Sequence, residues 1–207
     1  MSDPAFLISA FVTLFVVVDP IGLTPLFIAL TTGATAAHRR AVALRACLIA
    51  AVLLTVFGLA GEIILTAIGI TMPAFQIAGG ILLFLTALDM LFERRTERRE
   101  GQEAPHDDDP SVFPLATPLL AGPGALATMI LLSSQNNGDP MAILTINAAM
   151  AAVLALSLIL FRAGGLLERA LGHTGIVVVT RLLGILLAAL SVQFVLDGIR
   201  DLGLIGA

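Results

Sequence analysis

The sequence predicts an all-α polytopic membrane protein with six transmembrane helices, and three observations predict this class. The mean hydropathy is +1.02 and only 13% of the 207 residues are charged, against about 25% in a soluble domain. Apolar runs of the roughly 20 residues that cross a bilayer recur along the chain. Ten of the eleven arginines lie in or beside every second connection between these runs, which places them on one side of a membrane.

Six apolar runs are the predicted spans, and they divide a single membrane domain, residues 1–207, into two halves. The spans are residues 6–30, 41–65 and 71–92 in the first half (1–92), and 111–134, 141–161 and 175–199 in the second half (111–207). The linker between the halves, residues 93–110, carries four arginines and seven acids. We expect a solvated cytoplasmic connection there, disordered in its second part, from 104 to 110.

The arginine distribution also predicts the orientation of the chain. Arginine-rich connections stay in the cytoplasm, so both termini should face outward. The first residues lack the basic region of a signal peptide, and we expect the first span to be an uncleaved anchor.

Two of the spans are interrupted near their middle. Residues 19–25 of the first read Asp-Pro-Ile-Gly-Leu-Thr-Pro, and residues 117–124 of the fourth read Thr-Pro-Leu-Leu-Ala-Gly-Pro-Gly. Helix-breaking residues at this depth are tolerated only where protein or a water-lined cavity surrounds them, and paired interruptions in the two halves are typical of a transporter's binding site. With three spans per half, the halves should be inverted repeats, and residues 76–83 resemble 181–188 in support of a repeat.

The first interruption offers two kinds of binding group. Residues before proline avoid the helical region, so we expect Asp19 and Thr24 to leave it. Thr24 and Pro25 are then interpreted as the N-cap and the first residue of a second half-helix, whose N–H groups would bind an anion. Asp19 would end the first half-helix, where a cation is favoured, so a zwitterion such as an amino acid fits both. The alternative is a kinked structural helix in which Asp19 caps its own turn.

The fourth-span interruption repeats the cap-plus-proline pattern with bare backbone at Gly122, Pro123 and Gly124. Contact with a substrate through the backbone and close helix packing both explain these glycines. Thr128 either adds a hydroxyl to the site or bonds to its own helix. The predicted substrate-binding residues are therefore Asp19, Pro20, Gly22, Thr24, Pro25, Gly122, Pro123, Gly124 and Thr128.

Other classes of function find little support in the sequence. An intramembrane aspartyl hydrolase needs two carboxylates in one site, and only Asp19 lies at mid-depth, so we predict no enzyme and no catalytic residue. The single cysteine, Cys47, and three histidines confined to connections predict no metal site. We expect no cofactor and no nucleic-acid partner; membrane lipid and a small-molecule substrate are the expected partners, and a homo-oligomer stays open.

Four motifs resemble those of the MarC family of bacterial inner-membrane proteins. They are residues 19–22 with Pro25 and Thr31, residues 118–125, residues 78–84 with Asp89, and residues 192–194 with 197–199. The family includes a small-neutral-amino-acid transporter and is thought related to LysE-type exporters. The resemblance implies six spans in the inner membrane and alternating-access transport, including export, of small neutral amino acids or similar zwitterions, with a proton or sodium ion for coupling. The alternatives are an exporter of other small molecules and a non-transporting protein of stress response or signalling.

Overall fold

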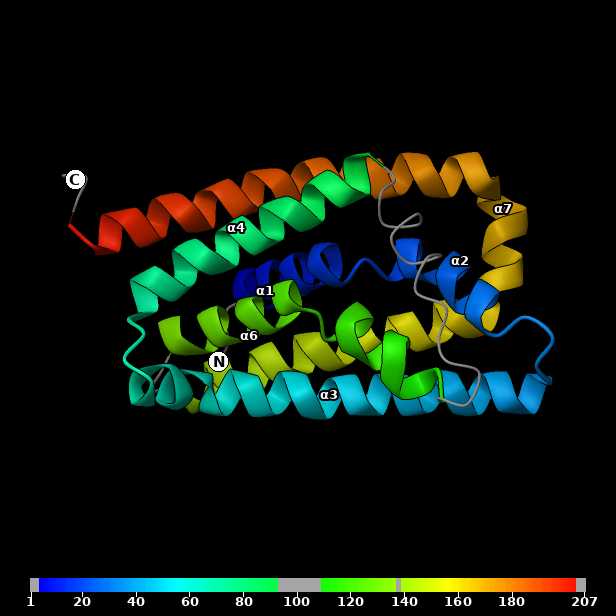
Figure 1. The fold of residues 1–207 in the computed structure, drawn as a ribbon, viewed down its shortest axis with the longest axis horizontal. Helices are drawn as coiled ribbons and strands as arrows, with labels where there is room; N and C mark the ends of the chain where they lie inside the picture. The colour runs from blue at the N-terminus through cyan, green and yellow to red at the C-terminus, as the bar shows by residue number, and fades with distance from the viewer. Residues whose placement is uncertain (1–3, 93–108, 137–138, 204–207) are drawn as a thin grey trace.

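The computed structural model describes residues 4–92, 109–136 and 139–203, and it is all-helical within these ranges. The predicted linker, residues 93–110 with a disordered part from 104 to 110, lies outside the described residues except for Asp109 and Pro110, which precede η1. The elements are α1 (Pro4–Val18), α2 (Pro20–Leu30), α3 (Ala36–Ala67), α4 (Met72–Leu91), the π-helix η1 (Ser111–Leu120), α6 (Pro123–Gln135) and α7 (Pro140–Asp201). Figure 1 shows them as a long bundle.

Five helical segments in the described ranges are long and apolar enough to cross a membrane: Pro4–Leu30, Ala36–Ala67, Met72–Leu91, Pro140–Leu167 and Arg169–Asp201. A sixth span results if η1 and α6, which are bent by 54° at their junction, are counted as one. The all-helical class is thus confirmed, with five spans or six. The helices run beyond the predicted apolar limits because their ends include charged residues, such as Arg39 and Arg40 in α3.

The fifth and sixth predicted spans form one element, α7, with a sharp turn at Gly172. This glycine has φ 63° and ψ 172°, a left-handed backbone that glycine adopts without a Cβ clash. Figure 1 shows the consequence: the first arm of α7 runs near α3, and the second arm returns beside α4.

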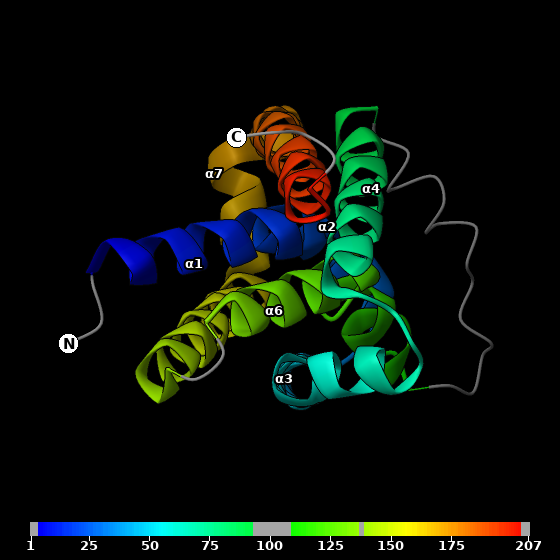
Figure 2. The ribbon, with the colours of Figure 1, turned by 90° about the vertical axis from the view of Figure 1, so that its left-hand side faces the viewer.

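Small residues let α4 approach the second arm of α7. A Cβ built on Gly80 would lie 2.8 Å from the carbonyl oxygen of Ser191, and one on Gly198 would lie 3.0 Å from that of Pro73. A Cβ on Gly184 would lie 3.0 Å from the Met90 side chain. Backbones this close are typical of membrane helix pairs, and both Figures 1 and 2 show the two helices side by side.

The start of η1 is attached to α3 by one ion pair. Arg45 lies 3.0 Å from Asp109, whose other carboxylate oxygen accepts a hydrogen bond from the backbone N–H of Ser111. The bonds from Ser111, with a smaller contribution from Arg45, lower the pKa of Asp109. The ionised Asp109 carboxylate therefore contacts both α3 and the start of η1.

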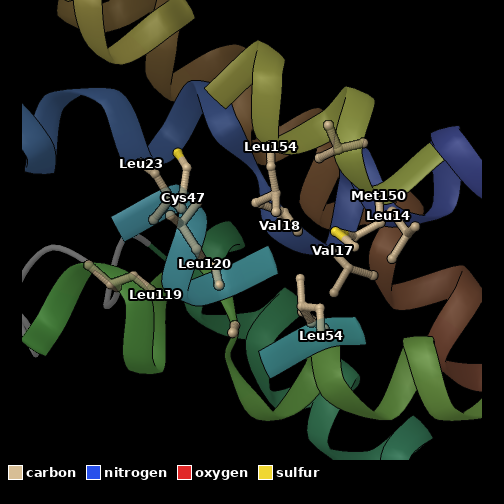
Figure 3. Packing of buried hydrophobic residues seen from close by; sticks show 14 of the residues in the cluster. Leu14, Val17, Val18, Leu23, Cys47, Leu54, Leu119, Leu120, Met150 and Leu154 are labelled. Atoms are coloured by element: carbon tan, nitrogen blue, oxygen red, sulfur yellow. The ribbon is translucent and has the colours of Figure 1, made fainter. Parts of the chain in front are cut away.

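Both interrupted spans lie in the centre of the hydrophobic core. Figure 3 shows labelled side chains from α1, α2, α3, η1 and α7 in a single cluster. Val17 and Val18, just before the first interruption, and Leu120, just before the second, belong to this cluster and are at most 4% exposed. The first interruption is enclosed at Asp19, Pro20 and Thr24, whereas the second is buried at Leu119–Gly122 and exposed at Pro118 and Pro123.

Candidate functional site

Asp19 separates α1 from α2 and belongs to neither. Its backbone is left-handed, with φ 53° and ψ 63°, and its side chain is 0% exposed. The Asp19 N–H donates to the Phe15 carbonyl at 2.9 Å, as the last bond of α1. Its Oδ1 accepts from the Gly22 N–H at 3.0 Å, which caps α2. Asp19 therefore leaves the helical region, as predicted, and also caps its own turn, as the alternative interpretation required.

The predicted start of the second half-helix at Thr24 and Pro25 is wrong. Both residues lie inside α2, which begins at Pro20, and the Thr24 hydroxyl donates to the Pro20 carbonyl at 2.8 Å. A proline inside a helix removes one hydrogen bond, at about 3 kcal/mol, whereas ending the helix would leave several backbone groups without partners in an apolar core. Losing one hydrogen bond costs less than leaving several backbone groups unpaired, so the chain stays helical through Pro25.

This shift changes the chemistry of the first interruption. The N-terminal end of α2, which would attract an anion, already has the Asp19 carboxylate bound to it. Pro20 carries no N–H, so the Val16 carbonyl cannot receive the usual bond from four residues on. The first interruption thus presents a buried carboxylate and a freed carbonyl, and both favour a cation.

Gly22 allows the Asp19 carboxylate to lie directly against the backbone of α2. A Cβ on Gly22 would overlap this carboxylate and would lie 3.0 Å from the Thr180 hydroxyl oxygen. The Thr180 hydroxyl is buried and has no hydrogen-bond partner among the described residues. Thr180, in the second arm of α7, is a site residue that the sequence analysis missed. Its only signal in the sequence is a hydroxyl within the apolar run 175–199.

The second interruption follows the predicted cap-plus-proline pattern. Gly122 is the N-cap of α6, with φ −76° and ψ 170°, and Pro123 is the first helical residue. Within the described chain no side chain caps this helix. The Leu126 N–H bonds to the Gly122 carbonyl at 2.9 Å, so the N–H groups of Gly124 and Ala125 are the first-turn donors that the helix leaves open.

The glycines of the second interruption also allow close packing. A Cβ on Gly122 would lie 2.5 Å from the Pro118 carbonyl oxygen, and one on Gly124 would lie 2.7 Å from the Leu83 side chain. Thr128 is fully buried and bonds to its own helix, donating to the Gly124 carbonyl at 2.9 Å. The close-packing explanation is therefore confirmed, and contact of a substrate with the backbone at the start of α6 stays a prediction.

The two interruptions are neighbours. The Cβ position of Gly124 is 3.6 Å from the Val17 side chain, two residues before Asp19. The end of α1 thus contacts the start of α6, which belongs to the opposite half of the chain. Of the predicted set, Thr24, Pro25 and Thr128 are placed within helices, and the others surround the two junctions.

Two other polar side chains of the spans lie outside this region. Asn147, which is part-buried, and Gln193, which is exposed, bond within their own helix, to the Ile143 carbonyl and the Asp197 carboxylate. In residues 4–92, 109–136 and 139–203, no three His, Cys, Asp or Glu side chains gather in a way that could hold a metal ion.

Two cavities open toward opposite ends of the bundle from the interrupted spans. One, of about 640 Å³, is lined by residues of α2, the start of α3 and the end of the first arm of α7. The other, of about 560 Å³, is lined by residues of α6, the end of α3 and the start of α7. Asp19 is not among the described residues that line either cavity, so the region around it is closed from both.

Membrane-length helices packed around a buried polar junction define an integral membrane protein. The chain belongs to the MarC family of integral membrane proteins, whose family model matches residues 5–202.

Similar proteins come from archaea and bacteria. The UPF0056 membrane protein MJ1677 of Methanocaldococcus jannaschii is 37% identical over 201 residues, which are 96% of this chain and 98% of that protein. The UPF0056 inner membrane protein YhgN of Escherichia coli is 37% identical over 194 residues, 94% of this chain and 96% of its own length. YvbG of Bacillus subtilis is 34% identical over 203 residues, 96% of each chain. No solved structure matches the chain.

Proposed function

We propose that this protein transports small zwitterionic metabolites, with small neutral amino acids as the expected class, across the inner membrane. The observation that carries the proposal is the meeting of two mid-span junctions with opposite chemistry. One junction holds the buried Asp19 carboxylate, and the other holds the uncapped N-terminal end of α6. A zwitterion needs both groups, one for its ammonium and one for its carboxylate.

The substrate lies with its ammonium at Asp19 and its carboxylate at the N–H groups of Gly124 and Ala125. Charge-assisted hydrogen bonds from a helix start to a carboxylate are favourable, and α2 cannot supply them because Asp19 itself caps that helix. The Thr180 hydroxyl adds a polar group on the ammonium side, where a coupling proton or sodium ion could also bind. Neighbouring atoms already fill the space at Gly22 and Gly124. Little room remains for a substrate between the two junctions, so the substrate should have a small side chain.

The helix contacts support an inverted repeat. In the first half α2 packs against the first arm of α7 at Gly164, whose Cβ would meet Thr24 and Ile28. In the second half the corresponding α6 packs against α3 at Gly58 and Gly61. A two-fold axis that exchanges the halves would relate these two contacts, map the α4–α7 contact onto itself and exchange the two cavities.

Alternating access then follows as a rocking of one half against the other. The structure corresponds to a closed state, because Asp19 is fully buried and neither cavity reaches it. The arginine-rich cavity faces the cytoplasm in this proposal, which keeps both termini outside.

The test is transport by purified protein in liposomes, offered labelled small amino acids with and without proton or sodium gradients. Asp19→Asn removes the charge but keeps a good N-cap for α2, so the protein should fold. Loss of a charge-assisted hydrogen bond worth on the order of 1.5–3 kcal/mol should reduce apparent affinity about ten- to a hundredfold. Asp197→Asn is the control, because Asp197 lies near the end of α7 and contacts Gln193 and Arg200. Equal transport by wild type and Asp19→Asn would show that Asp19 only caps a kink.

A further inference from the structure

Three arginines converge on one cavity at the end of the bundle where α3 begins. Arg39 and Arg40 come from the second turn of α3, and Arg162 comes from the first arm of α7. The cavity has a volume of about 640 Å³. Figure 1 shows the start of α3 and the turning region of α7 at the same end of the molecule. Residues more than a hundred positions apart in the sequence therefore contribute to a single hollow.

The positive charge of this cavity has no counterpart in the described chain. No carboxylate is among its described lining residues. The ion pairs of Arg45 with Asp109 and of Arg200 with Asp197 both lie outside the cavity. Three like charges around one hollow repel each other, and the repulsion falls when an anion binds between them.

The rest of the lining is apolar. Phe27 and Phe161 stack with ring centroids 4.7 Å apart, and Ile28 and small residues complete the wall. Phe27 and Phe161 are only 1% and 2% exposed, so Ile28 and the small residues supply the apolar surface beside the arginine cluster. A ligand that matches the cavity carries an anionic group and an apolar part.

We propose that this cavity binds the phosphate of an anionic phospholipid. Guanidinium groups pair with phosphate oxygens through two parallel hydrogen bonds, and basic pockets between membrane helices on the cytoplasmic side are suited to lipid headgroups. The apolar wall favours a lipid over a free phosphate ion, because only the lipid has chains to cover Ile28 and the alanines beside it. This site is separate from the Asp19 region and does not depend on the proposed transport.

Binding here would act on the contact between α2 and α7. Gly164, in the cavity wall, is the residue against which Ile28 and Thr24 of α2 pack. A lipid phosphate bound to Arg39, Arg40 and Arg162 would join the start of α3 to the first arm of α7 across the end of α2. The bound lipid should therefore stabilise the closed arrangement of this end.

The experiment measures thermal unfolding of the purified full-length protein in detergent with added phosphatidylglycerol, phosphatidylcholine or inorganic phosphate. At a lipid concentration ten times Kd, phosphatidylglycerol should raise the Tm of the wild type by about 3–6 °C, and the other two should not. The combined variant Arg39→Gln, Arg40→Gln, Arg162→Gln should lose this shift. Arg169→Gln is the matched control, an exposed arginine two turns further along α7 that should keep it.

Each alternative result overturns the proposal in a distinct way. An equal shift with inorganic phosphate would mean a site for a free anion, and an equal shift with phosphatidylcholine would mean that charge is not recognised. Loss of the shift in Arg169→Gln would mean a diffuse positive surface. If the triple variant does not fold, the Arg162→Gln single variant should reduce the apparent affinity for phosphatidylglycerol at least threefold, and an unchanged affinity would count against the site.

Discussion

At the scale of single residues, a substitution at Gly22 tests directly how closely the Asp19 carboxylate packs against α2. Gly22→Ala would place a Cβ on the Asp19 carboxylate and against Thr180. Since an extra methyl in a packed core costs about 1–3 kcal/mol, we expect a lower Tm together with loss of transport.

The matched control for this change is Gly165→Ala, also within a helix. A Cβ at Gly165 would meet no other described atom within 4 Å, so alanine should keep or raise the Tm because it restricts the unfolded chain. Differential scanning of the two variants in detergent measures the difference. Equal stability of both variants would contradict the close approach of Gly22 to Asp19.

Thr180 gives a second prediction, because its buried hydroxyl has no hydrogen-bond partner among the described residues. Thr180→Val keeps the shape and removes the hydroxyl. If the hydroxyl serves the substrate or a coupling ion, KM should rise about two- to tenfold, the value of one hydrogen bond, while the Tm stays equal or rises. Thr86→Val, which removes a hydroxyl bonded to the Leu82 carbonyl, is the control. A fall in Tm with KM unchanged would assign Thr180 a structural role instead.

The residues of the candidate site divide into those that local chemistry predicts and those that tertiary structure alone reveals. Asp19 and the Gly122–Pro123 pair could be predicted, because an acid or a proline in an apolar span must be accommodated by a break. Thr180 could not, since neither its hydroxyl nor the neighbouring Arg181 indicates which other helix it meets. Only the packing of α7 against Gly22 brings its hydroxyl to the site.

At the scale of elements, the two prolines of the first span have different expected roles. Pro20 begins α2 directly after the left-handed Asp19, whereas Pro25 lies inside the helix. Pro20→Ala would supply an N–H for the Val16 carbonyl and should let α1 continue into α2, which would remove the junction and abolish transport. Pro25→Ala should keep the junction and raise the stability of α2, by up to about 3 kcal/mol.

Measurements of transport and thermal stability on these two alanine variants show which proline makes the functional break. If Pro25→Ala abolished transport and Pro20→Ala did not, the functional break would lie at Thr24–Pro25, where the sequence alone had placed it.

The limits of the helices show why this prediction from sequence was wrong. The tendency of a residue before proline to leave the right-handed helical region is a local effect. It holds at Asp19, which takes a left-handed backbone and caps the next helix with its side chain. At Thr24 the local preference meets the larger cost of freeing backbone groups in an apolar core. The turn at Gly172 illustrates the opposite case: a single glycine lets α7 reverse while its hydrogen bonding stays nearly continuous.

At the scale of the whole molecule, hydropathy and the arginine distribution predicted the all-helical class and spans close to those observed. They could not predict which helices pack together. The neighbours of α2 and α6 depend on where Gly164, Gly58 and Gly61 allow close approach, and glycines of this kind are indistinguishable in the sequence from others in the spans. The inverted repeat stays a proposal, supported by the correspondence of these contacts.

The rocking motion that this repeat implies can be tested by locking each end separately. A Cβ on Gly58 would lie 3.3 Å from the Ser133 hydroxyl oxygen, and a Cβ on Gly164 would lie 3.2 Å from Cγ1 of Ile28. Both approaches are close enough for a disulfide, so Gly58→Cys with Ser133→Cys should join α3 to α6, and Gly164→Cys with Ile28→Cys should join α7 to α2. Cys47, the single native cysteine, is replaced by alanine in both.

We expect oxidation of either pair to abolish net transport and a thiol reductant to restore it, because transport requires each end to open in turn. The single-cysteine variants should be insensitive to oxidation.

The two locked proteins should also differ in the end that can open. Closing the α3–α6 contact leaves only the arginine-lined end free to open, and closing the α7–α2 contact leaves only the opposite end free. Labelling of cysteines introduced near each cavity, from either side of sealed vesicles, measures this. Undiminished transport by a fully cross-linked pair would show that these helices do not separate, and the inverted-repeat mechanism would then be wrong even if Asp19 binds the substrate.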